Sequence, residues 1–134
     1  MKYPGRMISG IFGLITAVFT LYIVYAADTG TLPPSIIRLY RFPGGDKAGH
    51  VLIFGILTLG LSALLHPRRI RLRGISLPAG MVLTAVLTTL EEISQRFIAG
   101  RTFDLLDLAC SYLGIVLGFL AWMLLKPARR TATR

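Results

Sequence analysis

The sequence predicts an all-α integral membrane protein, a bundle of four transmembrane helices with both termini in the cytoplasm. Two observations lead to this fold class. Of the 134 residues, 54% are hydrophobic and only 16% are charged, and the mean hydropathy is +0.66, whereas roughly a quarter of the residues in a soluble domain are charged. The basic residues also lie between long apolar runs, as they do in membrane proteins.

Four apolar runs are the expected spans. Residues 7–27 contain no charge, and at 1.5 Å per residue they cover a hydrocarbon core of roughly 30 Å. We expect this run to remain as an anchor, because it is longer than the roughly 7 to 15 apolar residues of a signal peptide. The other spans are predicted at residues 48–65, 77–93 and 105–125. No repeat is visible, so we expect one domain over residues 1–134.

The connections between the spans differ in composition. The first is rich in Pro and Gly, which supply turns. Within it, residues 35–42 are expected to form a short interfacial helix, with Tyr40 and Phe42 at head-group depth. The second connection is an arginine-rich loop.

Charge is distributed unequally over the two sides of the predicted bundle. Ten of the fifteen bases fall on one side: Lys2, Arg6, Arg68, Arg69, Arg71, Arg73, Lys126, Arg129, Arg130 and Arg134. The positive-inside rule places that side in the cytoplasm. All six acids fall on or near the other side: Asp28, Asp46, Glu91, Glu92, Asp104 and Asp107.

The net charge of +9 does not indicate nucleic acid, because a DNA-binding domain spreads its bases over a solvated face. Anionic lipid head groups are the expected partner instead. The single cysteine, Cys110, excludes an intramolecular disulfide and a multi-cysteine metal site.

Polar residues recur at helical spacing on three of the predicted spans. The second begins with Asp46, Lys47 and His50, which share its outer end. An ionisable group in hydrocarbon costs several kcal/mol unless it is paired or hydrated, so such residues need an explanation.

The third and fourth spans repeat this pattern at the same membrane face. Glu91 and Gln95 lie four residues apart, as do Glu92 and Arg96. On the fourth span three polar residues recur at i, i+3 and i+7, with Arg101 just before them: Asp104, Asp107 and Ser111.

A purely structural interpretation accounts for part of this set. A carboxylate in the first turn of a helix caps free N–H groups, which would explain Asp104 or Asp107. Glu92 with Arg96 would be a local ion pair, and His50 a neutral histidine in the bundle. The structural interpretation explains less well why three helices bring these groups to one face, and this convergence favours a functional polar pocket.

These residues resemble the VanZ-like family of bacterial membrane proteins. The similarity covers roughly residues 46–118 and rests on Asp46-Lys47-x-x-His50, Glu91-Glu92-x-x-Gln95, Gly100-Arg101, Asp107, Gly114 and Gly118. Where the family usually has Asn, this chain has Ser111. The resemblance implies a protein of the bacterial cytoplasmic membrane, in a group named for an accessory protein of teicoplanin resistance. It implies no established chemistry.

Three functions are compatible with the pattern. The first is binding or processing of an anionic envelope-lipid head group, such as a polyisoprenyl phosphate or a lipid-linked sugar, at the outer leaflet. Lys47, Arg96 and Arg101 would hold phosphate, because Arg offers a bidentate fork. His50, Glu92 and Asp107 are the candidate catalytic groups. The remaining candidate ligand-binding residues are Asp46, Glu91, Gln95, Asp104 and Ser111.

A divalent cation is a further candidate ligand, because oxygen-rich sites with one imidazole suit several metals. Its ligands would be His50, Glu92, Asp104 and Asp107. The second function is a lipid or proton-coupled transporter that uses intramembrane carboxylates. The third is a non-catalytic membrane adaptor in which the polar cluster is structural.

Overall fold

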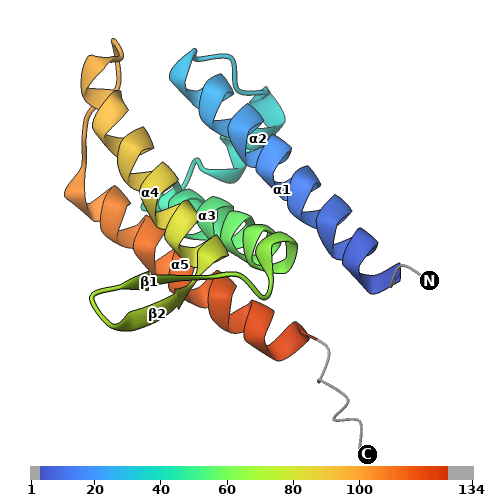
Figure 1. Cartoon of the computed structure of the whole chain (residues 1–134). Helices are drawn as coiled ribbons and strands as arrows, with labels where there is room; N and C mark the ends of the chain where they lie inside the picture. Colours follow the sequence, from blue (N-terminus) through green and yellow to red (C-terminus); the bar gives the residue numbers. More distant parts are fainter. Residues whose placement is uncertain (1–3, 127–134) are drawn as a thin grey trace, which may run out of the picture.

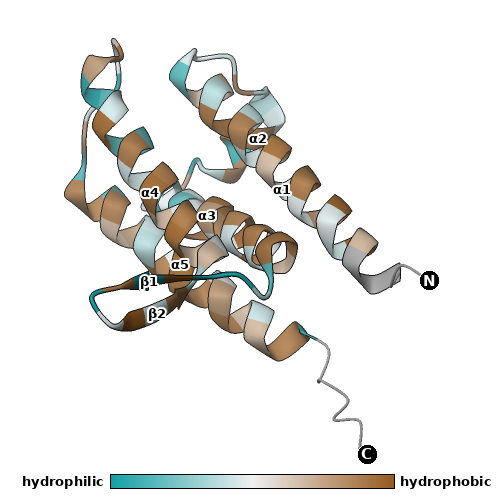
Figure 2. Ribbon diagram, in the orientation of Figure 1, coloured by the Kyte–Doolittle hydropathy of each residue, from teal (hydrophilic) through white to brown (hydrophobic). Residues whose placement is uncertain are grey.

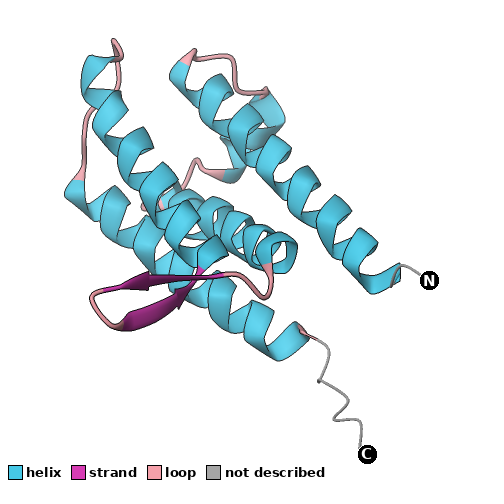
Figure 3. Ribbon diagram, viewed as in Figure 1, coloured by secondary structure: helices cyan, strands magenta, loops and turns pink. Residues whose placement is uncertain are grey.

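The computed structural model describes residues 4–126, with side chains described from residue 7 onward, and it is mostly helical (Figures 1 and 3). Its helices are α1 (Pro4–Asp28), α2 (Pro34–Leu39), α3 (Gly45–Leu65), α4 (Ala79–Ser94) and α5 (Leu105–Leu125). The strands β1 (Arg69–Leu72) and β2 (Ile75–Pro78) lie between α3 and α4, and a 3-10 turn, η1 (Gln95–Phe97), follows α4.

Three helices in the described part of the chain are long and apolar enough to cross a membrane. They cover Met7–Asp28, Gly45–Leu65 and Leu105–Leu125. Helix α4 has 16 residues and is about 24 Å long. It is therefore shorter than a hydrocarbon core of roughly 30 Å.

Helix α3 is the centre of the bundle and contacts α1, α4 and α5. It runs parallel to α5, because Lys47 meets Asp107 at one end and His66 packs against Trp122 at the other. It runs antiparallel to α1, where Gly13 packs on Gly60. The start of α1, the end of α5 and the β-hairpin consequently lie at one end of the bundle (Figure 1).

The interior of the bundle combines an apolar cluster of Phe54, Leu57, Leu61 and Ile115 with many polar side chains, and its outer surface is apolar. Its fully or nearly buried polar side chains are Thr16, Thr20, Thr58, Ser62, Thr84, Thr88, Glu92, Gln95 and Ser111. Large apolar side chains such as Leu14, Ile15 and Val18 are exposed on the helices (Figure 2). Soluble proteins bury such residues. This surface is suited to lipid, where helices associate through small and polar residues.

Glycines set the distance between α3 and α5. A Cβ on Gly114 would overlap the Val51 carbonyl oxygen, and one on Gly118 would overlap the Gly55 carbonyl oxygen. The glycine pair on α5 therefore mediates packing within the chain, which is the close helix approach that a GxxxG spacing permits.

The loop predicted between the second and third spans is a β-hairpin, and the all-α prediction is wrong here. Residues 77–78, predicted to begin the third span, belong to β2. Leu72 pairs with Ile75 across a two-residue turn in which Arg73 and Gly74 have φ angles of 46° and 86°. Positive φ at both positions gives the type I′ turn that joins antiparallel strands.

The charges separate between the two ends as the sequence predicts. The described bases at the hairpin end are Arg68, Arg69, Arg71, Arg73 and Lys126, and all six acids lie toward the opposite end. The other bases counted for that end lie outside the described residues or have undescribed side chains: Lys2, Arg6, Arg129, Arg130 and Arg134. At the acidic end, α2 is a short helix where one was expected at residues 35–42, with proline in its first turn, but it ends at Leu39, before Tyr40 and Phe42.

Candidate functional site

An ion cluster centred on Lys47 joins α3 to α5. Its Nζ lies 3.0 Å from Asp46 Oδ2, 2.9 Å from Asp107 Oδ1 and 3.4 Å from Asp104 Oδ2. An ammonium group has three hydrogen-bond donors, so these carboxylates engage all of them. Lys47 is therefore a bridge between helices and has no donor left for a phosphate.

The next polar group on α3, His50, bonds to α5. Its Nδ1 lies 2.9 Å from Ser111 Oγ, and that hydroxyl donates its proton to the Asp107 carbonyl oxygen at 2.9 Å. In the tautomer with hydrogen on Nδ1, the His50 ring donates to this hydroxyl. The other ring nitrogen, Nε2, is 4.0 Å from Asp107 Oδ2.

Asp104 is the N-cap of α5, which confirms that capping explains one of the acids. Its Oδ1 accepts the Leu106 N–H at 2.8 Å. This hydrogen bond, with help from the Lys47 ammonium, holds the pKa of Asp104 below its usual value of 3.8. The carboxylate is thereby kept charged at the start of the helix.

Glu92 is completely buried (0% exposed) and holds the chain entering α5. Its Oε1 accepts the backbone N–H of Asp104 at 2.9 Å, and its Oε2 has no hydrogen-bond partner among the described residues. Within residues 4–126 no ion pair joins Glu92 to Arg96, so the expected pair does not form. Arg96 instead lies over the Phe103 ring, 4.5 Å from its centroid.

Arg101 connects α1 with α4. Its Nε is 3.4 Å from Asp28 Oδ1, and its Nη2 is 3.9 Å from Glu91 Oε1. The latter oxygen also accepts the Gln95 side-chain N–H at 2.7 Å, as the spacing of those two residues predicts. Arg101 Nε is buried and makes no hydrogen bond within the described chain. The guanidinium is therefore charge-compensated but keeps at least one N–H unsatisfied.

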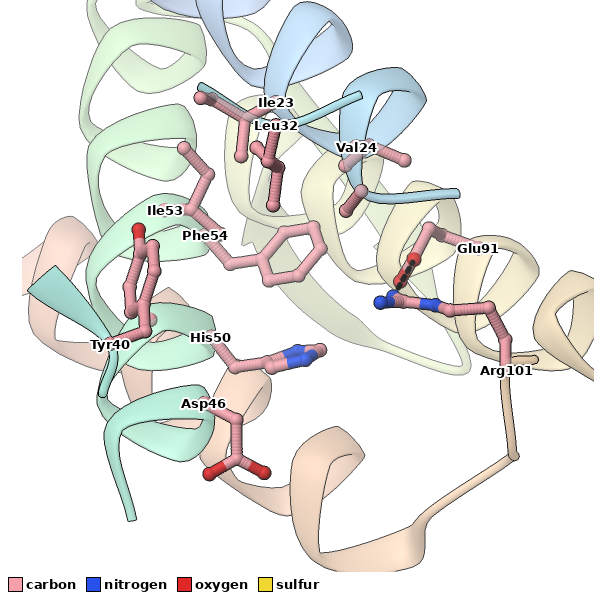
Figure 4. Close-up of a pocket in the computed structure, with 12 residues that line it drawn as sticks. Ile23, Val24, Leu32, Tyr40, Asp46, His50, Ile53, Phe54, Glu91 and Arg101 are labelled. Carbon is pink, nitrogen blue, oxygen red and sulfur yellow. Dashed lines mark ion pairs between the residues drawn. The ribbon is translucent and has the colours of Figure 1, made fainter. Parts of the chain in front are cut away.

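A cavity of about 230 Å³ lies beside these groups (Figure 4). Most of its wall is formed by apolar residues or glycine: Ile23, Val24, Ala27, Leu32, Gly49, Ile53 and Phe54. The rest of its lining is polar: Tyr40, Asp46, His50, Glu91 and Arg101. In Figure 4 the His50 ring points into the cavity from α3, and the Arg101–Glu91 pair faces it from the other side. The cavity thus joins an apolar wall to ionisable groups.

The predicted residues fall into two groups, those that line the cavity and those that lie behind it. Four of them line the cavity: Asp46, His50, Glu91 and Arg101. Six others touch these or one another behind it: Lys47, Glu92, Gln95, Asp104, Asp107 and Ser111. Arg96 is part of neither group. The sequence patterns did not assign Asp28 or Tyr40 to the site. The signal for Asp28 was its position at the end of the first apolar run, on the same predicted side as the other acids.

The residues expected to bind a divalent cation do not form a metal site. Among residues 4–126 no group of three or more His, Cys, Asp or Glu side chains is arranged to hold a metal ion. The positive charge between Asp104 and Asp107 comes instead from Lys47.

In comparisons with known proteins, no protein-family model, curated protein or solved structure matches this chain. The geometry of the site is accordingly the basis for inferring its function.

Proposed function

We propose that the chain is a multi-pass protein of the bacterial cytoplasmic membrane that crosses it four times, with both ends inside. The parallel arrangement of α3 and α5 supports the fourth crossing, because a chain leaving α3 at one face must return before α5 begins at the other. Helix α4, extended by η1 and the residues up to Asp104, makes that return. The bases at the hairpin end support the orientation.

We infer that the cavity binds the head group of an anionic envelope lipid at the outer leaflet. The observation that carries this inference is the unsatisfied, buried Nε of Arg101 at the polar end of a cavity whose wall is apolar. A phosphate oxygen would accept that N–H, and Arg presents a fork that suits phosphate. A polyisoprenyl phosphate or a lipid-linked sugar supplies both a phosphate for Arg101 and a hydrocarbon chain for the apolar wall.

The charges in the cavity favour a lipid over a free anion. Asp46 and Glu91 line the same space and repel a phosphate. Arg101 must also exchange its 3.4 Å contact with Asp28 and its 3.9 Å contact with Glu91 for the ligand. That exchange breaks two long ion pairs rather than short hydrogen bonds. Burial of the lipid chain against Ile23, Ile53 and similar side chains offsets the remaining cost.

If the site carries out a reaction, His50 is the residue placed to move a proton. It lines the cavity, and its Nε2 is the ring nitrogen that is not hydrogen-bonded to Ser111. Glu92 and Asp107, the other candidate catalytic groups, do not line the cavity. They act as positioning residues, because Glu92 holds the start of α5 and Asp107 orients both Lys47 and Ser111. The VanZ-like resemblance includes all three and favours a role in glycopeptide resistance.

A membrane adaptor with a structural polar cluster is the second candidate. The saturation of Lys47 by three carboxylates favours it, since such a cluster holds helices together without any ligand. The two functions differ in what Arg101 does. In an adaptor it only links Asp28 to Glu91, and no lipid competes for it.

Thermal unfolding in detergent distinguishes the two. A polyisoprenyl phosphate at a hundred times its Kd should stabilise the wild type by roughly 2.7 kcal/mol. Arg101→Gln should abolish this shift, whereas Arg96→Gln should keep it, because Arg96 lies near the same face but outside the cavity. The neutral polyisoprenol and inorganic phosphate are the ligand controls. A shift that Arg101→Gln leaves unchanged would exclude the proposed site.

A further inference from the structure

A second cavity, of about 280 Å³, lies at the hairpin end of the bundle, between the ends of α3 and α5 and the start of α4. Basic side chains line one part of it: His66, Arg68, Arg69 and Lys126. Apolar residues of α5 line another part: Phe119, Trp122 and Met123. All six Asp and Glu side chains of the chain lie toward the opposite end.

Two side chains that line this cavity, Ser62 and Arg68, have no side-chain partner among the described residues. Ser62 is only 3% exposed, lines the cavity, and its Oγ has no hydrogen-bond partner among the described residues. The Arg68 side chain makes no hydrogen bond or ion pair with another described residue. Arg69, in contrast, is held by the hairpin, because its Nε donates to Ser76 Oγ at 2.8 Å.

The first turn of α4 adds backbone donors. Its N-cap is Pro78, and no side chain caps the helix. The Ala79 N–H is satisfied by the Arg68 carbonyl oxygen at 3.1 Å, but the N–H groups that follow have no partner within the helix. Gly80 lines the cavity and packs so closely on Ser62 that a Cβ would overlap the α3 backbone. An uncapped N-terminus thus meets a buried free hydroxyl.

We propose that this cavity is a phosphate site, in which Arg68, Ser62 and the first turn of α4 bind the phosphate of an anionic phospholipid or of a soluble phosphate compound. Helix N-termini bind anions through free N–H groups and the helix dipole, and Arg forms charge-assisted hydrogen bonds with phosphate. The apolar α5 side chains offer a surface for an acyl chain. The site is independent of the cavity at the acidic end.

Binding of phosphatidylglycerol to the purified full chain, measured by native mass spectrometry against phosphatidylcholine, tests the proposal. Arg68→Gln should weaken binding of phosphatidylglycerol about tenfold, and Ser62→Ala about fivefold. Arg71→Gln is the matched control, because it removes one charge from the same hairpin outside the cavity. In Arg101→Gln the part of the binding that depends on Arg68 should remain, which separates this site from the head-group site at the other end.

Inorganic phosphate and glycerol phosphate, titrated by isothermal calorimetry, identify the source of the phosphate. If only the lipid binds and Arg68→Gln weakens it, the ligand is a phospholipid. If a soluble phosphate binds with the same dependence on Arg68, the ligand comes from the aqueous phase. Equal losses in Arg68→Gln and Arg71→Gln, or equal binding of the two lipids, would overturn the proposal. Unchanged helicity and gel-filtration profiles establish that each variant is folded.

Discussion

Lys47 Nζ lies 2.9 Å from Asp107 Oδ1, a residue 60 positions further along the chain, and this contact ties the first turn of α3 to the first turn of α5. It fixes the register of two helices that pack through glycines along their length. The same ammonium holds Asp46 and Asp104. One lysine therefore controls the geometry behind the cavity without entering it.

Removing that charge should destabilise the bundle. We expect Lys47→Met to lower the melting temperature, because Asp104 and Asp107 then face each other without a counter-charge. Adding Asp107→Asn should restore part of the loss, since one orphaned charge is removed. Lys126→Met, the same substitution at the opposite end, is the control. Equal melting temperatures for Lys47→Met and Lys126→Met would show that the cluster contributes nothing to stability.

The contact between α3 and α5 should not tolerate even one methyl group. Gly118→Ala places a Cβ against the Gly55 carbonyl oxygen, so we expect a loss of about 1–3 kcal/mol. Gly10→Ala is the matched control, because its Cβ would meet only the Leu64 Cδ1 at 3.9 Å. Unfolding in mixed detergents measures both. Similar stability of the two variants would contradict the packing described.

Acid should weaken the start of α5 through Asp104. Its folded pKa lies below the usual value of 3.8, so the stability this carboxylate contributes is present above that value and is lost as the pH falls through the lower folded pKa. Asp104→Asn keeps a capping side chain but removes the charge. Its melting temperature should therefore change less with pH below about 4.

High salt provides the internal control for this titration. The Asp104 side chain is 42% exposed, so screening should reduce the contribution of the Lys47 ammonium to the difference between wild type and Asp104→Asn. Parallel acid profiles of the two proteins at low salt would contradict the assignment.

The four-crossing topology predicts which loops reach the cell exterior. In a Cys110→Ala background, a cysteine at Thr102 should react with an impermeant maleimide in intact cells. A cysteine at Ile70, in the hairpin, should react only after the membrane is permeabilised. Protection of position 102 together with labelling of position 70 would reverse the orientation, and labelling of both would show that α4 does not return the chain across the membrane.

Several features of this architecture can be predicted from residue patterns, because hydrophobicity is a local signal. The fourth predicted span, residues 105–125, coincides with α5, and the second differs from α3 only in its first turn. The third predicted span begins two residues before α4, because residues 75–78 pair as a strand. Arg73-Gly74 is not one of the Asn-Gly or Asp-Gly pairs that mark such a turn, so Gly74 alone was a weak signal for the hairpin.

Contacts between helices are harder to predict, because they depend on helix rotation. The spacing of Asp104, Asp107 and Ser111 was sufficient to place them on one face of α5. Which partner each takes required the structure: Lys47 turned out to contact both Asp104 and Asp107, and His50 to contact Ser111. Asp28 and Arg101, 73 positions apart in the printed sequence, carried no local signal of their ion pair.

Photocrosslinking tests the central claim most directly. A polyisoprenyl phosphate analogue with a diazirine close to its phosphate is irradiated with the wild type and with the Arg101→Gln and Arg96→Gln variants. The head-group site predicts adducts on residues 23–27 or 49–54, lost in Arg101→Gln and kept in Arg96→Gln. Adducts spread over the exposed apolar face of α1, around Leu14 and Val18, with no effect of Arg101→Gln, would contradict it.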